Sequence, residues 1–216
     1  MPQLVYFGIQ GRAQMIRYAL AASGTTYEDK HITQEEWGTL KADATYGKGV
    51  QVPVLIQDDG TILNQSIALL RKVCFDGGFV PKTGDEAYGE RWFFDADADW
   101  MKADGSMRPF FAGDADEATQ DKAVEIMRGH LQKLNDFIGG SRKYFAGDNV
   151  TAADFRLLVI DTGMCNNPGL KIAAFGEKLR ALWGEFENVK RVCDNVKALP
   201  GVQDAADKAI ALNAWL

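Results

Sequence analysis

The sequence predicts an α/β N-terminal domain followed by an all-α C-terminal domain. Three observations lead to this prediction. Short apolar runs alternate with helical patterns over residues 1–80, a glycine-rich segment at residues 76–84 interrupts every periodicity, and only helical patterns follow it. With 216 residues and 46% hydrophobic content, the chain is long enough to bury a substantial core. We therefore expect two domains, residues 1–80 and 85–216.

The first four elements alternate strand and helix. Residues 4–7 form an apolar run that predicts a strand, and residues 12–22 follow with apolar side chains at helical spacing and Gly24 just beyond. Residues 27–32 predict a second strand. The next helix is expected over residues 34–44, since acidic residues at its start suit a first helical turn.

Residues 51–71 complete the first domain. The apolar run at residues 52–56 ends at Asp58, Asp59 and Gly60, which predicts a turn and a hairpin partner at residues 61–63. A helix then begins near Ser66. The resulting order, β-α-β-α-β-β-α, is the thioredoxin-like one and implies a mixed sheet.

The second domain reads as a helical bundle. Helical patterns cover residues 88–107, 119–138, 151–164 and 175–199, and a short one begins at Val202. Thr151 and Asp154 have the spacing of a capping box, in which each side chain bonds the backbone N–H of the other residue.

Charge and targeting signals exclude several classes of partner. The net charge is −6, and no run of Lys or Arg is long enough to follow a phosphate backbone, so we expect neither nucleic acid nor an anionic membrane as partner. The first six residues lack a basic region followed by an apolar core, and no apolar run approaches the roughly 20 residues that span a bilayer. A cytoplasmic location is the expectation.

Cysteine and histidine usage also limits the chemistry. Cys74, Cys165 and Cys193 are widely spaced and odd in number, which is typical of reduced thiols and argues against a disulfide framework or a zinc site. His31 and His130 lie far apart in sequence, so a Ser-His or Cys-His pair has little support.

The acidic run at residues 95–99 has the spacing of the first ligands of a calcium-binding loop, but it does not fit such a loop further on. An EF-hand loop needs glycine at its sixth position and glutamate at its twelfth, where this chain has Trp100 and Ser106. On a helix, Asp97 points away from Asp95 and Asp99, so we expect no metal site.

Two stretches, Tyr6 to Ala13 and Gln51 to Arg71, resemble the soluble glutathione transferases of the tyrosine type, and are most similar to the sigma class with features of the alpha, mu and pi classes. The resemblance implies that Pro53 is cis, that the backbone of Val52 pairs with the cysteinyl part of glutathione, and that Gln65 and Ser66 bind the γ-glutamyl carboxylate. A helix N-terminus suits an anion because its first N–H groups lack acceptors. The alternative for Ser66 is a plain helix cap.

The resemblance also implies that the Tyr6 hydroxyl donates a hydrogen bond to the glutathione sulfur. Such a donor favours the thiolate, which is the nucleophile. Arg12 stands at a helix start, where a cation is mildly unfavourable, which indicates a specific role in orienting Tyr6 or in adding positive field at the sulfur. The alternative for Tyr6 is an ordinary strand aromatic.

Further site residues follow from the same resemblance. Trp37, Lys41 and Gln51 are expected at the glycine end of glutathione, with a core tryptophan and a solvated lysine as alternatives. Asp99 is expected to reach the γ-glutamyl amine in the other subunit of a homodimer. Some sigma-class members that make prostaglandin D2 bind a divalent ion nearby through three carboxylates, and this chain has Ala98 at one of those places.

The electrophile is expected in a pocket between the domains. Its predicted walls are the loop at residues 6–11 and a group of side chains near the end of the first long helix, namely Trp100, Met101, Ser106, Met107 and Phe110.

We therefore expect a dimeric glutathione transferase that joins reduced glutathione, as co-substrate, to small hydrophobic electrophiles. Two alternatives stay open. One is a glutathione-dependent isomerase similar to prostaglandin D synthase. The other is a non-enzymatic relative, such as a lens crystallin, that keeps the scaffold alone.

Overall fold

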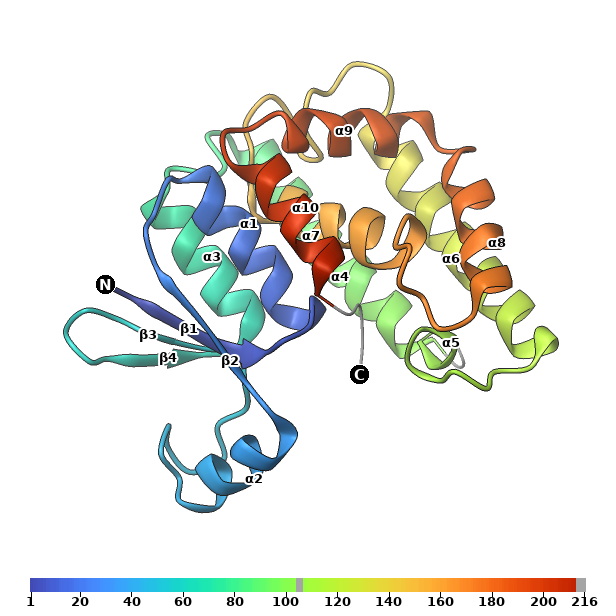
Figure 1. Cartoon of the computed structure of the whole chain (residues 1–216). Helices are drawn as coiled ribbons and strands as arrows, with labels where there is room; N and C mark the ends of the chain where they lie inside the picture. Colours follow the sequence, from blue (N-terminus) through green and yellow to red (C-terminus); the bar gives the residue numbers. More distant parts are fainter. Residues whose placement is uncertain (104–106, 213–216) are drawn as a thin grey trace.

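A four-stranded mixed sheet forms the N-terminal part of the computed structural model, which describes residues 1–103 and 107–212 (Figure 1). The strands lie in the order β2-β1-β3-β4. β1 (Gln3–Phe7) pairs in parallel with β2 (Glu28–Ile32) and antiparallel with β3 (Val54–Ile56), which pairs antiparallel with β4 (Ile62–Asn64). The predicted thioredoxin-like order and the mixed sheet are thus confirmed.

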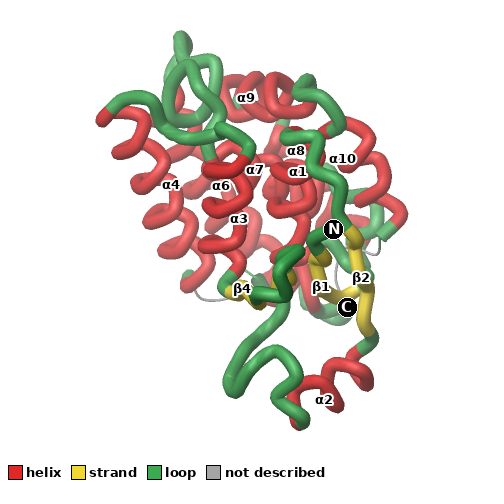
Figure 2. Tube along the Cα trace, turned by 90° about the vertical axis from the view of Figure 1, so that its left-hand side faces the viewer, coloured by secondary structure: helices red, strands yellow, loops and turns green. Residues whose placement is uncertain are grey.

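The two faces of the sheet are covered differently. α1 (Gln14–Ala22) and α3 (Ser66–Asp76) lie between the sheet and the C-terminal helices, whereas α2 (Gln34–Ala42) stands apart below them (Figures 1 and 2). Alternation along β1 explains this arrangement, because Leu4 and Tyr6 belong to the large core while Val5 packs with Trp37 in a small separate cluster. Tyr6 therefore faces the helical half of the molecule.

The C-terminal part is entirely helical among the described residues. Its elements are α4 (Gly84–Lys102), α5 (Arg108–Phe111), α6 (Glu117–Ile138), α7 (Ala152–Ile160), the π-helical turn η2 (Asp161–Cys165), α8 (Ala173–Trp183), α9 (Glu187–Lys197) and α10 (Val202–Ala211). α7 is the central helix, since all nine of its residues are buried. The loop between α3 and α4 falls inside the predicted linker, and the domain boundary itself stays a prediction.

The capping box at the start of α7 is confirmed. Asp154 accepts from the N–H of Thr151 at 2.8 Å, from its hydroxyl at 3.0 Å and from the N–H of Phe145 at 2.7 Å. Complete burial nevertheless raises the pKa of Asp154 to about 6, because desolvation outweighs these hydrogen bonds. The carboxyl group therefore ties the preceding loop to the central helix.

Two features of the helical part differ from the prediction. The pattern at residues 175–199 is two helices, because the chain turns at Gly184 and restarts at α9, where Asn135 Oδ1 accepts from the N–H of Asn188 at 3.0 Å. The helix expected over residues 88–107 begins earlier, at a Thr83 cap, and ends at Lys102. The short α5 follows separately.

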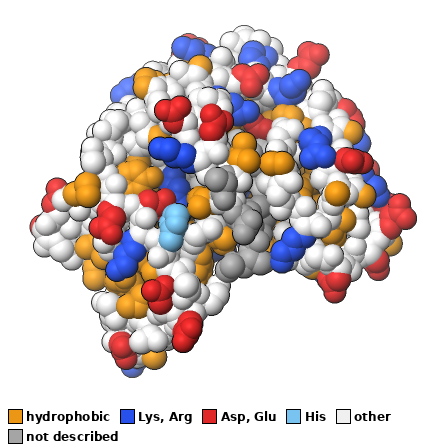
Figure 3. All heavy atoms as spheres, in the orientation of Figure 1, with side chains coloured by type: hydrophobic (Ala, Val, Ile, Leu, Met, Phe, Trp, Pro, Cys, Tyr) orange, Lys and Arg blue, Asp and Glu red, His pale blue; other side chains and the backbone are white. Residues whose placement is uncertain are grey.

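Charged side chains of both signs are scattered over the face seen in Figure 3. Within residues 1–103 and 107–212, no helix combines the length and apolar composition needed to cross a membrane.

Candidate functional site

Two adjoining cavities lie where the N-terminal part meets the helices. A small cavity of about 20 Å³ is lined by Arg12, Gln51, Val52, Pro53, Gln65 and Ser66. A larger cavity of about 540 Å³ shares Arg12, Gln65 and Ser66 with it. Six of the predicted site residues, drawn from three separate stretches of sequence, thus surround one position.

The Tyr6 hydroxyl lies behind two lining residues, Gly11 and Arg12, although Tyr6 itself lines neither cavity. The backbone N–H of Arg12, which lines both, donates to Tyr6 Oη at 3.2 Å. Because the oxygen already accepts a hydrogen bond, the hydroxyl proton is available for another group. The side chain is only 7% exposed, so such a donor acts in a site of reduced dielectric.

Gly11 makes room for this hydroxyl. Its φ is +41°, and a Cβ built on it would lie 2.6 Å from Tyr6 Oη and 2.8 Å from Tyr6 Cε1. An alanine would therefore both strain the backbone and clash with the ring. Gly11 was predicted only as the end of the loop at residues 6–11, with no role of its own.

The start of α3 forms part of the wall of the small cavity. Gln65, not Ser66, is the N-cap of the helix, and it has a positive φ of 72°. The first intrahelical bond runs from the N–H of Leu69 to Gln65 O at 2.9 Å, so the preceding N–H groups have no acceptor in the helix. Ser66 is the first helical residue, and the plain-cap alternative for it is wrong. The peptide bond between Val52 and Pro53 is cis, as expected.

Four predicted residues lie outside the lining of both cavities: Tyr6, which is next to them, and Trp37, Lys41 and Asp99. Trp37 is buried in the small cluster on the α2 side of the sheet, next to Val52, and Lys41 is exposed on the same helix. Asp99 is exposed on α4, while its neighbour Ala98 lines the larger cavity. The roles expected for Trp37, Lys41 and Asp99 stay predictions.

The larger cavity is mostly apolar. Its apolar walls come from six elements and include Met15, Ile67, Met101, Met107, Phe111, Val159 and Met164. Met101 and Met107 line this cavity, as expected for the electrophile pocket, whose role stays a prediction. The prediction that Trp100 and Phe110 line this cavity was wrong. The ring of Trp100 stacks on that of His130 with centroids 4.8 Å apart, and the ring of Phe110 packs against that of Phe175 at 5.1 Å inside the helical core. Ser106 lies outside the described residues.

An ion pair lies beneath the larger cavity. Arg156 on α7 donates from Nε to Asp97 Oδ2 at 3.1 Å and from Nη2 to Asp97 Oδ1 at 3.0 Å, and both residues are buried. His130 Nε2 lies 3.9 Å from Asp97 Oδ1, and burial lowers the pKa of His130 to about 3, so its ring is neutral at physiological pH.

The carboxylates of the acidic run do not converge. Asp97 faces inward to Arg156, while Asp95 is exposed and pairs with Arg91 at 2.7 Å. In the part of the chain that the structure describes, no three His, Cys, Asp or Glu side chains are grouped closely enough to hold a metal ion.

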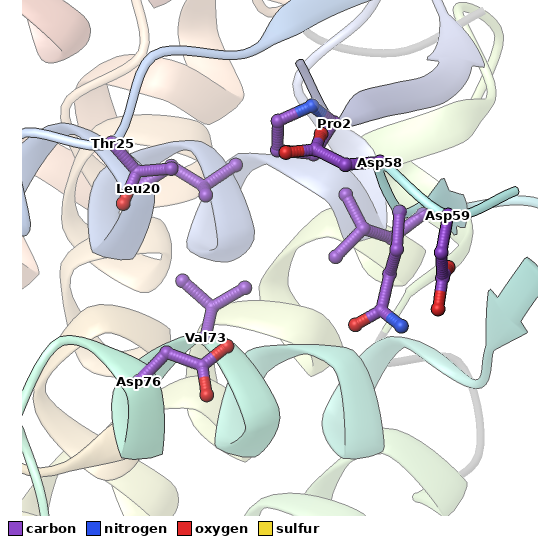
Figure 4. A pocket seen from close by; sticks show the side chains of 9 residues that line it. Pro2, Leu20, Thr25, Asp58, Asp59, Val73 and Asp76 are labelled. Carbon is purple, nitrogen blue, oxygen red and sulfur yellow. The ribbon is translucent and has the colours of Figure 1, made fainter. Parts of the chain in front are cut away.

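A third cavity, of about 360 Å³, lies between α1, α3 and the β3–β4 hairpin (Figure 4). Its carboxylates already have partners. Asp58 pairs with the N-terminal ammonium at 2.8 Å, Asp59 accepts from the N–H of Thr61 at 2.9 Å, and Asp76 pairs with Lys72 at 2.5 Å. This cavity shares no residue with the first two, which hold the candidate site.

Comparison with known proteins connects this geometry to a family. Residues 2–71 match the model of the glutathione S-transferase N-terminal domain, and residues 104–206 match that of the C-terminal domain. Human hematopoietic prostaglandin D synthase is 33% identical over 159 residues, covering 71% of this chain and 74% of the relative. Glutathione S-transferase 1 of Ascaris suum is 28% identical over 213 residues, covering 94% and 95%.

A solved structure described as monomeric Na-GST-3, a glutathione S-transferase of the hookworm Necator americanus, superposes with a TM-score of 0.75. It is 25% identical, and the match covers 96% of each chain.

Proposed function

Because this chain belongs to the glutathione S-transferase family, we propose that it transfers reduced glutathione to small apolar electrophiles, with Tyr6 stabilising the thiolate. Glutathione is the co-substrate of this family. The observation that carries the proposal is the buried Tyr6 hydroxyl, which accepts from the N–H of Arg12, a residue that lines both a polar and an apolar cavity.

The polar side suits the charged end of glutathione. A cavity of about 20 Å³ has room for one small group, and a carboxylate there would meet the Ser66 hydroxyl, the Gln65 amide and the N-terminus of α3. Arg12, which also lines this cavity, adds a positive charge. The backbone of Val52, beside Pro53, would pair with the peptide groups of the tripeptide.

Tyr6 supplies the chemical step. A free thiol has a pKa near 8.5, and each unit of lowering needs about 1.4 kcal/mol of preferential stabilisation of the thiolate. The thiol releases its proton to solvent, and the Tyr6 O–H donates to the sulfur. The sulfur electron pair then forms the C–S bond while the leaving group departs with its bonding pair.

The test compares two Tyr→Phe variants, Tyr6→Phe and Tyr144→Phe, because Tyr144 is also 7% exposed but lies in the helical part. All three proteins are measured for retention on immobilised glutathione and for conjugation of an aryl halide at pH 7. We expect Tyr6→Phe to bind glutathione but to lose about 10-fold to 100-fold in turnover, since a hydrogen bond to a charged group contributes about 1.5–3 kcal/mol.

Three outcomes would change the assignment. Unchanged turnover in Tyr6→Phe would remove Tyr6 from the mechanism. An equal loss in Tyr144→Phe would mean that the effect is structural. Retention of the wild type on glutathione without turnover would favour a non-enzymatic relative.

A second candidate is glutathione-dependent isomerisation, which the similarity to hematopoietic prostaglandin D synthase favours. In this reaction the thiolate attacks and later leaves, so the product is rearranged and glutathione is recovered. Mass spectrometry of the products distinguishes the two, because a stable conjugate supports transfer.

The homodimer and the cytosolic location remain predictions. All three cysteines are buried free thiols, which fits a reducing compartment. A monomeric family member is among the similar structures, so the oligomeric state needs its own measurement by light scattering.

A further inference from the structure

The floor of the apolar cavity contains a cation that thiolate chemistry does not use. Arg156 lies on α7, the central helix, and lines the larger cavity beside Val159. Its side chain is only 9% exposed. A guanidinium at this depth is costly unless its donors are satisfied.

Only some of these donors are satisfied by the protein. Nε and Nη2 bind the two oxygens of Asp97, and Nη2 also lies 3.8 Å from Met101 Sδ. For Nη1, no acceptor is found among residues 1–103 and 107–212. Nη1 is not among the fully buried atoms that lack a partner, and Arg156 lines the cavity, so this donor is open to an acceptor supplied from the cavity.

The charge around the cavity points to an electron-rich acceptor. The described lining contains three cations, Arg12, Lys102 and Arg156, and its single acidic member, Asp97, is already paired. The whole chain carries a net charge of −6, so this local excess of positive charge runs against the general balance. The remaining wall is apolar and rich in methionine, which adapts to different carbon skeletons.

We propose that Arg156 is a specificity-determining residue that binds an oxygen of the electrophile, either a carbonyl or a carboxylate, through Nη1. Asp97 is a positioning residue, since it fixes the guanidinium through two hydrogen bonds and leaves Nη1 directed to the substrate. This inference rests on the proposed transferase function and narrows its substrates to apolar electrophiles with an oxygen acceptor away from the reacting carbon.

The experiment uses three electrophiles with one reacting group: benzyl chloride, its para-acetyl derivative and its para-carboxy derivative. Each enzymatic rate is divided by the uncatalysed rate, which corrects for intrinsic reactivity. The main variant is the double change Asp97→Leu and Arg156→Met. It removes both charges at similar volume, a replacement that buried ion pairs often tolerate.

The control is the double change Asp161→Asn and Lys197→Met, which removes another partly buried pair, joined at 2.6 Å between η2 and α9. We expect the main variant to keep its rate with benzyl chloride and to show a KM raised about 10-fold to 100-fold for at least one oxygen-bearing electrophile. The control variant should have the same rate and KM as the wild type with all three electrophiles.

The single change Asp97→Asn distinguishes a carboxylate acceptor on the electrophile from a neutral carbonyl acceptor. It keeps a hydrogen-bond partner but leaves the charge of Arg156 uncompensated. If the ligand is a carboxylate, the KM for the para-carboxy electrophile falls while kcat is kept. If it is a neutral carbonyl, the KM for the para-acetyl electrophile is the one that rises in the double variant. A merely structural ion pair predicts no gain with any substrate.

An equal loss with all three electrophiles, or no change with any, would overturn the assignment of Arg156. If the wild type does not turn over benzyl chloride, the proposed function fails instead. The assignment is then read by calorimetry with unreactive para-toluic acid and para-methylacetophenone, compared with para-xylene. Binding of neither oxygen-bearing compound above that of para-xylene would overturn it.

Discussion

The two halves of the site are built from different materials. The polar half is lined by Arg12 and by five residues from two neighbouring stretches, Gln51 to Pro53 and Gln65 to Ser66. The apolar half consists of side chains that six separate elements bring together, with a buried ion pair beside them. The polar half is therefore specified mainly by residues close together in the sequence, and the apolar half by the packing of the helices. Changes in each half should therefore have different signatures.

The largest effect should appear in the folding stability at acidic pH, and it should come from the apolar half of the site. His130 backs the apolar half, and its pKa is lowered to about 3 by burial, by Arg156 and by Lys133, whereas Asp97 at 3.9 Å opposes this shift. The unfolded chain binds a proton near pH 6.5 and the folded chain does not, so stability is lost as the pH falls from 6.5 toward 3. The loss reaches about 5 kcal/mol at the low end.

His130→Phe keeps the stacking on Trp100 and removes this titration. Urea unfolding at pH 7 and pH 4 should show a smaller acid loss of stability in this variant than in the wild type. Equal acid losses in the two proteins would disprove the buried neutral state.

The polar half should be most sensitive to one methyl group. Gly11→Ala places a Cβ against the Tyr6 hydroxyl and should lower turnover about 10-fold to 100-fold, as loss of the hydrogen bond to sulfur would. Gly24→Ala is the matched control, because Gly24 also has a positive φ but has no atom within 4 Å of the added Cβ among the described residues. Its stability should fall by about 1 kcal/mol with turnover unchanged. Equal turnover in the two variants would contradict the role given to Gly11.

Relief of the backbone strain at Gln65 should have a smaller effect, raising the stability of the protein while its affinity for glutathione falls. A non-glycine residue at φ 72° costs about 1–3 kcal/mol, which Gln65→Gly relieves and Gln65→Ala does not. Both variants should bind glutathione more weakly by calorimetry, but the glycine variant should unfold at the higher urea concentration. Glutathione affinity unchanged in both would show that the amide makes no contact.

The smallest effect is expected in the apolar wall. Met164→Leu conserves volume, so stability should change by less than about 1.5 kcal/mol and the KM for an aryl halide by about twofold or less. A much higher KM for the aryl halide would mean that this wall fits one particular substrate and does not adapt to others.

The same contrast explains how far the sequence could be read. Pro53, Gln65 and Ser66 belong to one short stretch, so their relation to a helix start was predictable. Met15 and Met164 are 149 positions apart in the chain, as their numbers show, and meet only because α1 packs against α7 and its π-helical extension. No local pattern in a single sequence reports such a contact.

The errors have the same origin. Trp100, Met101, Phe110 and Phe111 are similar in hydrophobicity, and only the rotation of α4 and α5 decides which side chains face the cavity. Arg156 was missed because a basic residue within an apolar helical run does not reveal its partner, Asp97, 59 positions earlier.

The central claim is that Tyr6 stabilises the glutathione thiolate. It is tested most directly by the ultraviolet absorption of the thiolate, titrated with pH for glutathione bound to the wild type and to Tyr6→Phe. The account predicts a bound thiol at least about one unit below its free pKa of about 8.5 in the wild type, and a return toward that value by about one to two units in the variant. An identical pKa of the bound thiol in both proteins would contradict it.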